Sequence, residues 1–89
     1  MAVTSTTREL VSDCLARIVT GDPCAPMDLA SVFMSHVESK DVDMHLSVVE
    51  ALVVLSSKQG CQDAAQFLKE QWSGMKEGLR GRWQRAGFV

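Results

Sequence analysis

The first run of apolar positions has the spacing of one helical face. It follows Thr6 and Glu9, whose separation is that of a capping box, in which each side chain satisfies a backbone N–H of the first turn. The apolar positions that share this face are Leu10, Val11, Cys14, Leu15, Ile18 and Val19. Gly21 and Pro23 come next, and both are typical of a helix end. The pattern predicts a helix over about 7–20.

A second apolar stripe follows the two prolines of the chain. Pro26 suits the first turn of a helix, where its missing N–H is not needed, and Asp28 suits the positive end of the helix dipole. The positions that share the next buried face are Leu29, Val32, Phe33, His36 and Val37. The pattern predicts a helix over about 27–39 and a turn over 39–41.

The third apolar run is hydrophobic on nearly all sides. Asp43 is a suitable N-cap for it. One helical face carries Leu46, Val49, Leu52, Val53 and Ser56, and other sides carry Val48, Ala51, Val54 and Leu55. A short Val-rich run such as 45–56 could also be a buried strand, but its length and the stop at Gly60 favour a helix. Three other short helices would struggle to cover such a helix on every side, so we expect a partner or a second copy.

The fourth apolar run starts after Cys61 and has the spacing of a short coiled-coil seam. Its members are Ala65, Leu68, Trp72, Met75 and Leu79. Another face of the same continuation carries three glycines, Gly74, Gly78 and Gly81. Each glycine costs about 1 kcal/mol relative to alanine in a helix interior, so we expect the helix to fray or break near Gly74. The alternative is that the glycines admit another backbone. We expect a loosely structured or separately packed tail to follow, with Trp83 and Phe88 in it.

The fold class predicted by these runs is all-α, with four main helices in two antiparallel hairpins and a short C-terminal extension. A length of 89 residues allows one domain, 1–89, with flexible ends at 1–5 and 86–89. A domain of this size has a thin margin of stability, so contacts with a partner or a second copy would matter.

Composition and cysteine content point to a small globular protein. The net charge is -2, the sequence pI is about 5.5 and the mean hydropathy is +0.03. We expect no secretory signal, and the longest apolar stretch, 46–55, is shorter than the roughly 20 residues of a membrane span. Cys14, Cys24 and Cys61 are odd in number and form no recognisable disulfide framework, which favours a reducing cytoplasm. Two of them lie on apolar stripes, where cysteine acts as a small hydrophobe.

Charge is distributed unevenly along the chain. Residues 1–68 carry four basic and nine acidic side chains, whereas 69–89 carry five basic and two acidic ones. The tail interleaves an indole with guanidinium groups at Arg80, Arg82, Trp83 and Arg85. Such a tail could dock on an acidic protein surface, including that of a second copy. It could also pair phosphates and stack on nucleic-acid bases, although the acidic body argues against that reading.

A junction between two helices carries a resemblance to a known family. The segment 51–72 has two small residues, a Gln-Gly pair, a short turn, Asp-Ala and then a leucine, at Ser56, Ser57, Gln59, Gly60, Asp63, Ala64 and Leu68. This segment resembles the junction between repeats in Sel1-like proteins, a branch of the tetratricopeptide-type helical repeats. The resemblance covers about a quarter of the chain and implies a protein-binding helical module rather than an enzyme.

Catalytic and metal-binding patterns are sparse in the sequence. The only nucleophile pair on offer is Cys24 in the Pro-rich loop with His36 or His45 as its base. A zinc site would need Cys14, Cys24, His36 and His45 to converge without any paired short spacing. We expect instead that His36 is partly buried on its apolar stripe and that His45 is a surface group. We predict no cofactor and no metal.

The sequence therefore predicts a small non-enzymatic interaction module of the adaptor, chaperone or inhibitor type. Its partner would be another protein or a second copy, and a nucleic-acid-associated regulator using the Arg/Trp tail is the alternative. The residues predicted to bind a protein are Phe67, Trp72, Met75, Arg80, Arg82, Trp83 and Arg85. Among these, we expect Trp72 to belong to the monomer core rather than to contact a partner. Trp83 is the better candidate for a partner contact, because it stands outside the main seam.

Overall fold

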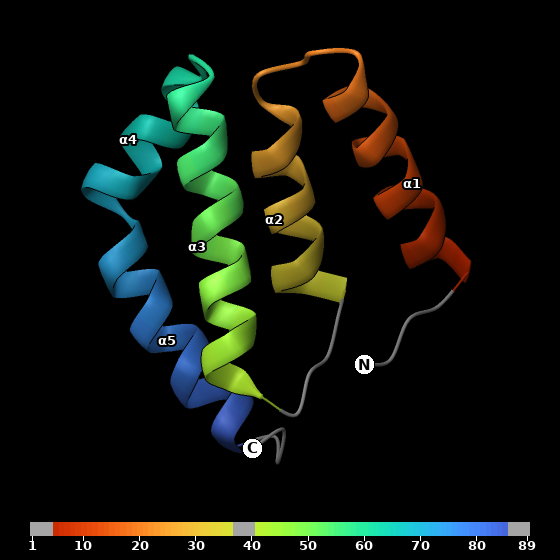
Figure 1. The fold of residues 1–89 in the computed structure, drawn as a ribbon. Helices are drawn as coiled ribbons and strands as arrows, with labels where there is room; N and C mark the ends of the chain where they lie inside the picture. Colours follow the sequence, from red (N-terminus) through yellow and green to blue (C-terminus); the bar gives the residue numbers. More distant parts are fainter. Residues whose placement is uncertain (1–4, 37–40, 86–89) are drawn as a thin grey trace.

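The computed structural model describes residues 5–36 and 41–85, and these residues form five helices (Figure 1). The helices are α1 (Ser5–Val19), α2 (Ala25–His36), α3 (Val42–Lys58), α4 (Gln62–Glu70) and α5 (Trp72–Arg85). The described residues include no strand, so the all-α prediction is confirmed and the third run is a helix. The description as four main helices is approximately consistent with the structure, but a fifth helix is present, because the fourth predicted run and the start of its extension divide into α4 and α5.

Some predicted boundaries lie outside the described residues. The predicted flexible end 86–89 is one of them. The predicted flexible end 1–5 is another, apart from Ser5, which begins α1. The last residues of the second predicted helix and most of the predicted turn over 39–41 also lie outside. Phe88 also lies outside them.

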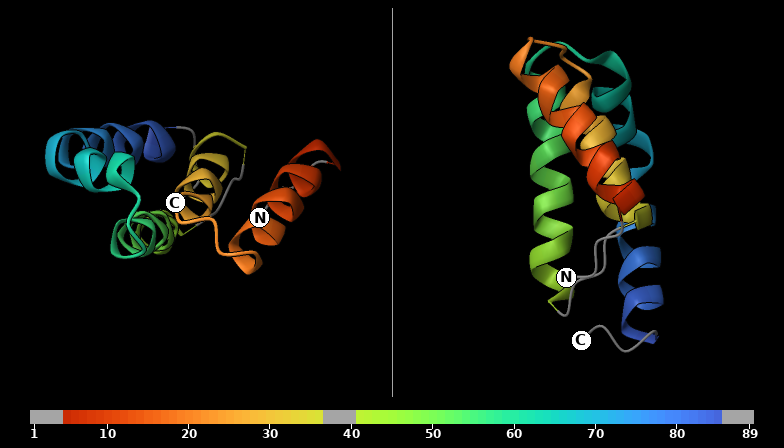
Figure 2. Two further views of the ribbon diagram at one scale, coloured as in Figure 1. Left: turned by 90° about the horizontal axis from the view of Figure 1, so that it is seen from above. Right: turned by 90° about the vertical axis from the view of Figure 1, so that its right-hand side faces the viewer.

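Consecutive helices pack beside one another in a thin slab. α1 packs on α2, α2 packs on α3, and the opposite flank of α3 packs on α4 and α5. α3 therefore lies in the middle of the row, between α2 and the α4–α5 arm, and the two views of Figure 2 show it displaced toward one broad face of the slab. The slab measures 36 × 32 × 15 Å, so most helices have neighbours on some sides only.

The ends of α3 follow capping rules, although its N-cap is not the predicted residue. Asp41, rather than Asp43, is the N-cap, and its Oδ1 accepts a hydrogen bond from the Met44 N–H at 2.9 Å. At the other end Gly60 adopts φ 103°, a conformation that glycine enters without steric cost. The predicted stop at Gly60 is therefore confirmed.

The break between α4 and α5 falls at Gln71, not near Gly74. Gln71 leaves the helical conformation at φ -123° and ψ -28°, and all three glycines lie inside α5. A Cβ added to Gly74 or Gly78 would meet no other atom within 4 Å, so these glycines do not admit a neighbouring backbone. The predicted break near Gly74 is therefore wrong, and no other described segment of the chain uses Gly74 or Gly78 for a close approach.

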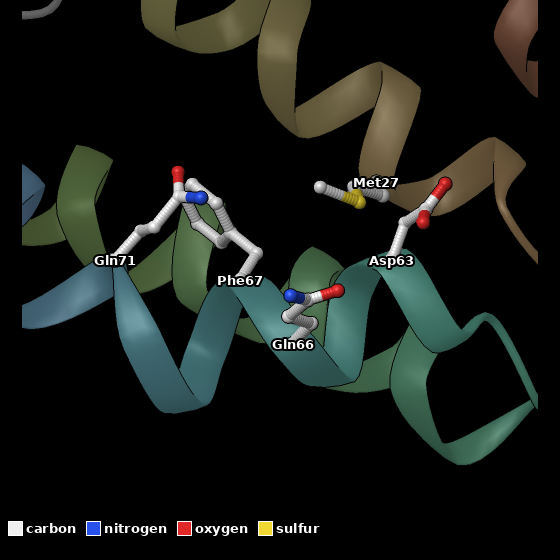
Figure 3. A pocket seen from close by; sticks show the side chains of 5 residues that line it. All are labelled: Met27, Asp63, Gln66, Phe67 and Gln71. Carbon is white, nitrogen blue, oxygen red and sulfur yellow. The ribbon is translucent and has the colours of Figure 1, made fainter.

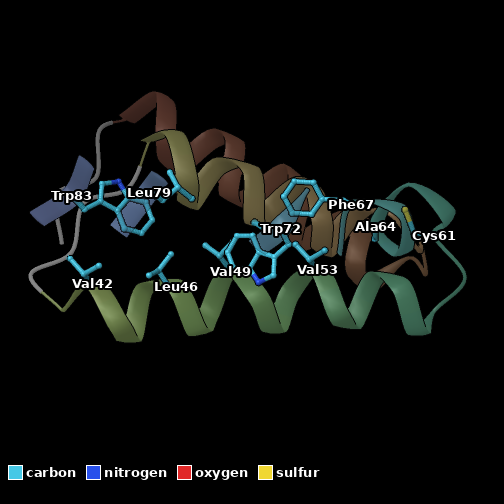
Figure 4. Close-up of a cluster of buried hydrophobic side chains, with 11 residues drawn as sticks. Val42, Leu46, Val49, Val53, Cys61, Ala64, Phe67, Trp72, Leu79 and Trp83 are labelled. Atoms are coloured by element: carbon cyan, nitrogen blue, oxygen red, sulfur yellow. The ribbon is translucent and has the colours of Figure 1, made fainter. Parts of the chain in front are cut away.

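One main core lies between α3 and the helices on its two flanks (Figure 4). The buried apolar side chains from α3 all point to the same side in that view, and they are Val42, Leu46, Val49 and Val53. They meet residues of α4 and α5, namely Ala64, Phe67, Trp72, Leu79 and Trp83. A smaller cluster of Cys14, Leu29 and Val32 holds α1 against α2. The predicted core face of α3 is confirmed.

A disulfide joins Cys24 to Cys61 across 37 residues of sequence, with their Cα atoms 5.1 Å apart. It connects the loop before α2 to the N-cap of α4. Next to it, the Met27 N–H donates to Ser56 Oγ at 2.6 Å, which ties the first turn of α2 to the last turn of α3. The prediction that the cysteines form no disulfide is wrong for this pair. The argument from cysteine content to a reducing compartment loses its basis, because disulfides persist chiefly in oxidising environments.

The loop between α1 and α2 is held by a carboxylate network around Arg17. The guanidinium contacts Asp22 Oδ2 at 2.9 Å and Asp28 Oδ2 at 2.6 Å, while Asp22 Oδ1 accepts from the Cys24 N–H at 2.9 Å. The hydrogen bonds from Arg17, and then the one from the Cys24 N–H, hold the pKa of Asp22 below its ordinary value. The two carboxylates in turn raise the pKa of Arg17.

Acid is expected to weaken this loop through Asp22. Because the pKa of Asp22 is lower in the folded chain than in the unfolded one, its stabilising contribution is present above the unfolded value of about 3.9 and is lost as pH falls through the folded value. D22N should therefore flatten the fall in unfolding free energy below about pH 4. Urea unfolding at a series of pH values checks this, with D63N in the exposed first turn of α4 as the matched control. Equal flattening in the two variants would contradict the prediction.

Candidate interaction surface

The side of α3 that faces away from the core carries a row of exposed apolar side chains. Met44, Val48 and Leu55 are 61%, 38% and 41% exposed, and Ala51 between them is exposed as well. These four residues follow one another at steps of four, three and four, the spacing of a helical seam that meets another helix. We name these four residues the α3 stripe.

No element among the described residues covers the α3 stripe. One flank of α3 carries His45 and Ser56, which contact Phe33 and Met27 of α2. The other flank carries Glu50, whose carboxylate accepts from Trp72 of α5. The stripe lies between these two flanks, on the side of α3 opposite its buried residues. Scattered apolar residues on a surface are ordinary, but an ordered row along one helix is typical of an interaction site.

Two opposite charges continue the α3 stripe at its ends. Asp41 lies three residues before Met44, and Lys58 lies three residues after Leu55; both are exposed. The acidic residue is at the N-terminal end and the basic residue at the C-terminal end, as the helix dipole favours. The next acidic residue, Asp43, points elsewhere, because its carboxylate pairs with Arg80 of α5.

Two of the predicted binding residues, Phe67 and Trp72, belong to the core. Both are buried, and their rings lie 5.9 Å apart between centroids. The Trp72 indole N–H donates to Glu50 Oε1 at 2.6 Å, so its polar group is satisfied inside the protein. Met75, three residues after Trp72, has a side chain that is 39% exposed. Of these three, only Met75 has a side chain accessible to a partner.

Trp83 is buried, which corrects the prediction that it stands outside the main seam. Its side chain is 5% exposed, and its ring lies 4.4 Å from that of His45 between centroids. His45, predicted to be a surface group, is buried as well, with Nε2 2.7 Å from the Phe33 carbonyl oxygen. His36 is exposed rather than partly buried, since α2 ends there. His45 and Trp83 are buried together because α5 continues past its glycines and places Trp83 against the start of α3.

The three predicted arginines of the tail differ in their surroundings. Arg80 is partly buried and paired with Asp43, while Arg82 and Arg85 are exposed. The indole predicted to work with them lies in the core, so no tryptophan ring beside these charges is accessible for stacking on bases. The sequence analysis recognised Val48, Ala51 and Leu55 as apolar surface in need of cover, but it did not count them among the predicted binding residues.

The predicted nucleophile pair lacks its nucleophile in the structure. Cys24 is bonded to Cys61, so it has no thiol to donate or activate. Cys14 keeps its thiol but is buried, and burial, followed by the negative charge of Asp28, raises its pKa. Within 5–36 and 41–85, no group of three or more His, Cys, Asp or Glu side chains could hold a metal ion.

A shallow hollow of about 270 Å³ lies between α2 and α4 (Figure 3). Its lining residues are Met27, Asp63, Gln66, Phe67 and Gln71. Phe67 is the one predicted binding residue there, and it forms the apolar floor while carboxylate and amide groups stand around it (Figure 3). The hollow is wide open and mixed in polarity, so its shape selects no particular ligand class.

Comparison with known proteins gives no relative for this chain. No protein-family model matches it, and no curated protein and no solved structure matches it either. The Sel1-like resemblance of 51–72 therefore stays a prediction. None of the five described helices combines the length and the apolar content that crossing a membrane would require.

Proposed function

We propose that this protein is a small non-enzymatic interaction module whose binding face is the α3 stripe. The observation that carries the proposal is the row of four exposed apolar side chains at seam spacing on the longest helix. Covering such a row removes apolar surface from water at a gain of about 25 cal/mol per Å², without any rearrangement of the core beneath it. The opposite face of the same helix is buried in the main core, so the stripe lies on a helix that the core holds in place.

The basic end of the chain supplies charge rather than anchoring side chains in this proposal. Arg82 and Arg85 are exposed on the last turns of α5, and Met75 is half-exposed on its first part. Phe67, Trp72 and Trp83 act from within the core, where they hold α4 and α5 against α3. Burial of Trp83 removes the stacking group on which a nucleic-acid role would depend, so protein binding is the function that we favour.

A photo-crosslinking amino acid at position 48 tests the proposed binding face. In cells that produce the chain, we expect discrete adducts from position 48 and few from position 15, a matched control that is an exposed leucine on α1. Adding L55K should suppress the adducts from position 48, because a lysine in the stripe must be desolvated when the stripe is covered. Equal yields at the two positions, or no adduct at position 48, would contradict the proposal.

A further inference from the structure

The spacing of the α3 stripe and its two flanking charges is the same when it is counted from either end of the helix. The six positions 41, 44, 48, 51, 55 and 58 follow at steps of three, four, three, four and three. Reversing the helix about the midpoint between Val49 and Glu50 places each member of the row on another member. This reversal exchanges Asp41 with Lys58, Met44 with Leu55, and Val48 with Ala51.

We propose that the occupant of the α3 stripe is the α3 stripe of a second copy, bound antiparallel across a two-fold axis at the level of Val49 and Glu50. The inference rests on the proposed binding face and adds the identity of the partner. A two-fold interface uses the same patch on both subunits, so residue i meets residue j and j meets i. The palindromic spacing of the stripe meets this requirement in one register.

Charge selects the antiparallel orientation. In that orientation Asp41 lies at the level of Lys58 of the partner subunit at both ends of the seam, giving two attractive pairs. A parallel pair would instead set Asp41 beside Asp41 of the partner subunit, and Lys58 beside its own copy, which is repulsive at both ends. The helix dipoles add to this preference, because the positive end of each helix then lies beside the negative end of the other.

Side-chain size suits the same arrangement. At the centre, the small Ala51 lies at the level of Val48 of the partner subunit, which lets the two helix axes approach. Further out, the flexible Met44 lies at the level of Leu55 of the partner subunit, so each outer level pairs two long side chains. Every apolar member of the stripe thus has an apolar counterpart, and no charged residue is placed opposite an apolar one.

The interface formed in this way is small. α3 has 17 residues, which makes it about 25 Å long, and only one side of it takes part. A stable protein–protein interface buries about 1,600 Å² in total, more than a single pair of such helices supplies. The dimer should therefore be weak and in exchange with the monomer, forming as protein concentration rises.

Two stripe variants test register and orientation together. M44D and L55K, each alone, set a charge against an apolar side chain at both ends of the seam, and we expect each to weaken self-association at least tenfold in sedimentation equilibrium. Mixing them should restore association, because the antiparallel pair brings the new aspartate opposite the new lysine and leaves a native Met–Leu level at the other end. L15K on α1 is the matched control and should associate like the wild type.

A second pair of variants tests the charged ends. K58E should weaken the dimer, since it sets two carboxylates at one level, whereas K69E on the exposed side of α4 makes the same change in net charge and should leave it unchanged. Circular dichroism confirms that each variant is folded. Failure of the M44D and L55K mixture to associate more than either variant alone, or equal weakening by L15K, would overturn the antiparallel dimer.

The outcomes also separate this inference from the proposed function. Photo-crosslinked adducts from position 48 with twice the 9.7 kDa chain mass support the dimer. Adducts of other masses alone, with a wild type that stays monomeric at every concentration, overturn the dimer and leave the binding face in place. Absence of any adduct from position 48 contradicts both.

Discussion

Replacing Trp83 with alanine is expected to lower the free energy of unfolding by about 3–5 kcal/mol, the usual cost of truncating a buried tryptophan. The indole is buried among Val42 and Leu79 and lies against the ring of His45. Its removal would leave a cavity where α5 meets the start of α3. Urea unfolding followed by circular dichroism measures the change.

The neighbouring arginine provides the control for this prediction. Arg82 is exposed on the same turn of α5, so R82A should change the free energy of unfolding by no more than about 0.5 kcal/mol. A loss of less than about 1 kcal/mol in W83A would mean that the α5 end is not packed on α3 as described.

Reduction of the Cys24–Cys61 disulfide should lower the free energy of unfolding by about 4 kcal/mol. The bond closes a loop of 37 residues, and the loss of chain entropy that it imposes on the unfolded state lies between about 3 kcal/mol for a 15-residue loop and about 4.7 kcal/mol for a 100-residue loop. Thermal unfolding with and without a thiol reductant measures this difference.

The double variant C24A/C61A is the control for the reductant. Because it has no disulfide to lose, the reductant should leave its melting temperature unchanged, while that temperature lies below the wild type's. Three free thiols in the denatured, unreduced wild type, with no effect of the reductant, would contradict the prediction. The free Cys14 accounts for one thiol in the oxidised chain.

Periodicity in the sequence was sufficient to predict the first three helices and the inner face of α3. Leu46, Val49 and Val53 share one side because 3.6 residues make a turn, and that relation holds without knowledge of any neighbour. The surplus apolar residues Val48 and Leu55 were also recognised as needing cover. Their exposure in the structure bears out the argument that the other helices do not enclose α3 completely.

The seam of the fourth apolar run was placed one residue out of phase in its first part. Ala64 and Phe67 are buried, whereas the predicted Ala65 is exposed and Leu68 is partly buried. The interruption at Gln71 shifts the helical phase, so a single repeat carried from one helix into the next cannot fit both. Gln71 gives no strong local signal, while the glycines that do give one are tolerated inside α5.

Contacts between distant segments account for the remaining errors. The pairing of His45 with Trp83 and the bond between Cys24 and Cys61 join residues that are 38 and 37 positions apart. No local pattern marks either pair, because each depends on how two helices dock. The predicted binding residues were consequently drawn toward large aromatic side chains, which the fold uses for its core instead.

The molar mass of the wild-type chain in solution, measured by light scattering from micromolar to near-millimolar concentration, tests the central claim most directly. The α3 stripe predicts a mass that rises from 9.7 kDa toward about twice that value, and a rise that L55K abolishes while L15K does not. A mass that stays at 9.7 kDa over the whole range, in a chain shown to be folded, would contradict the account of the stripe as a self-complementary surface.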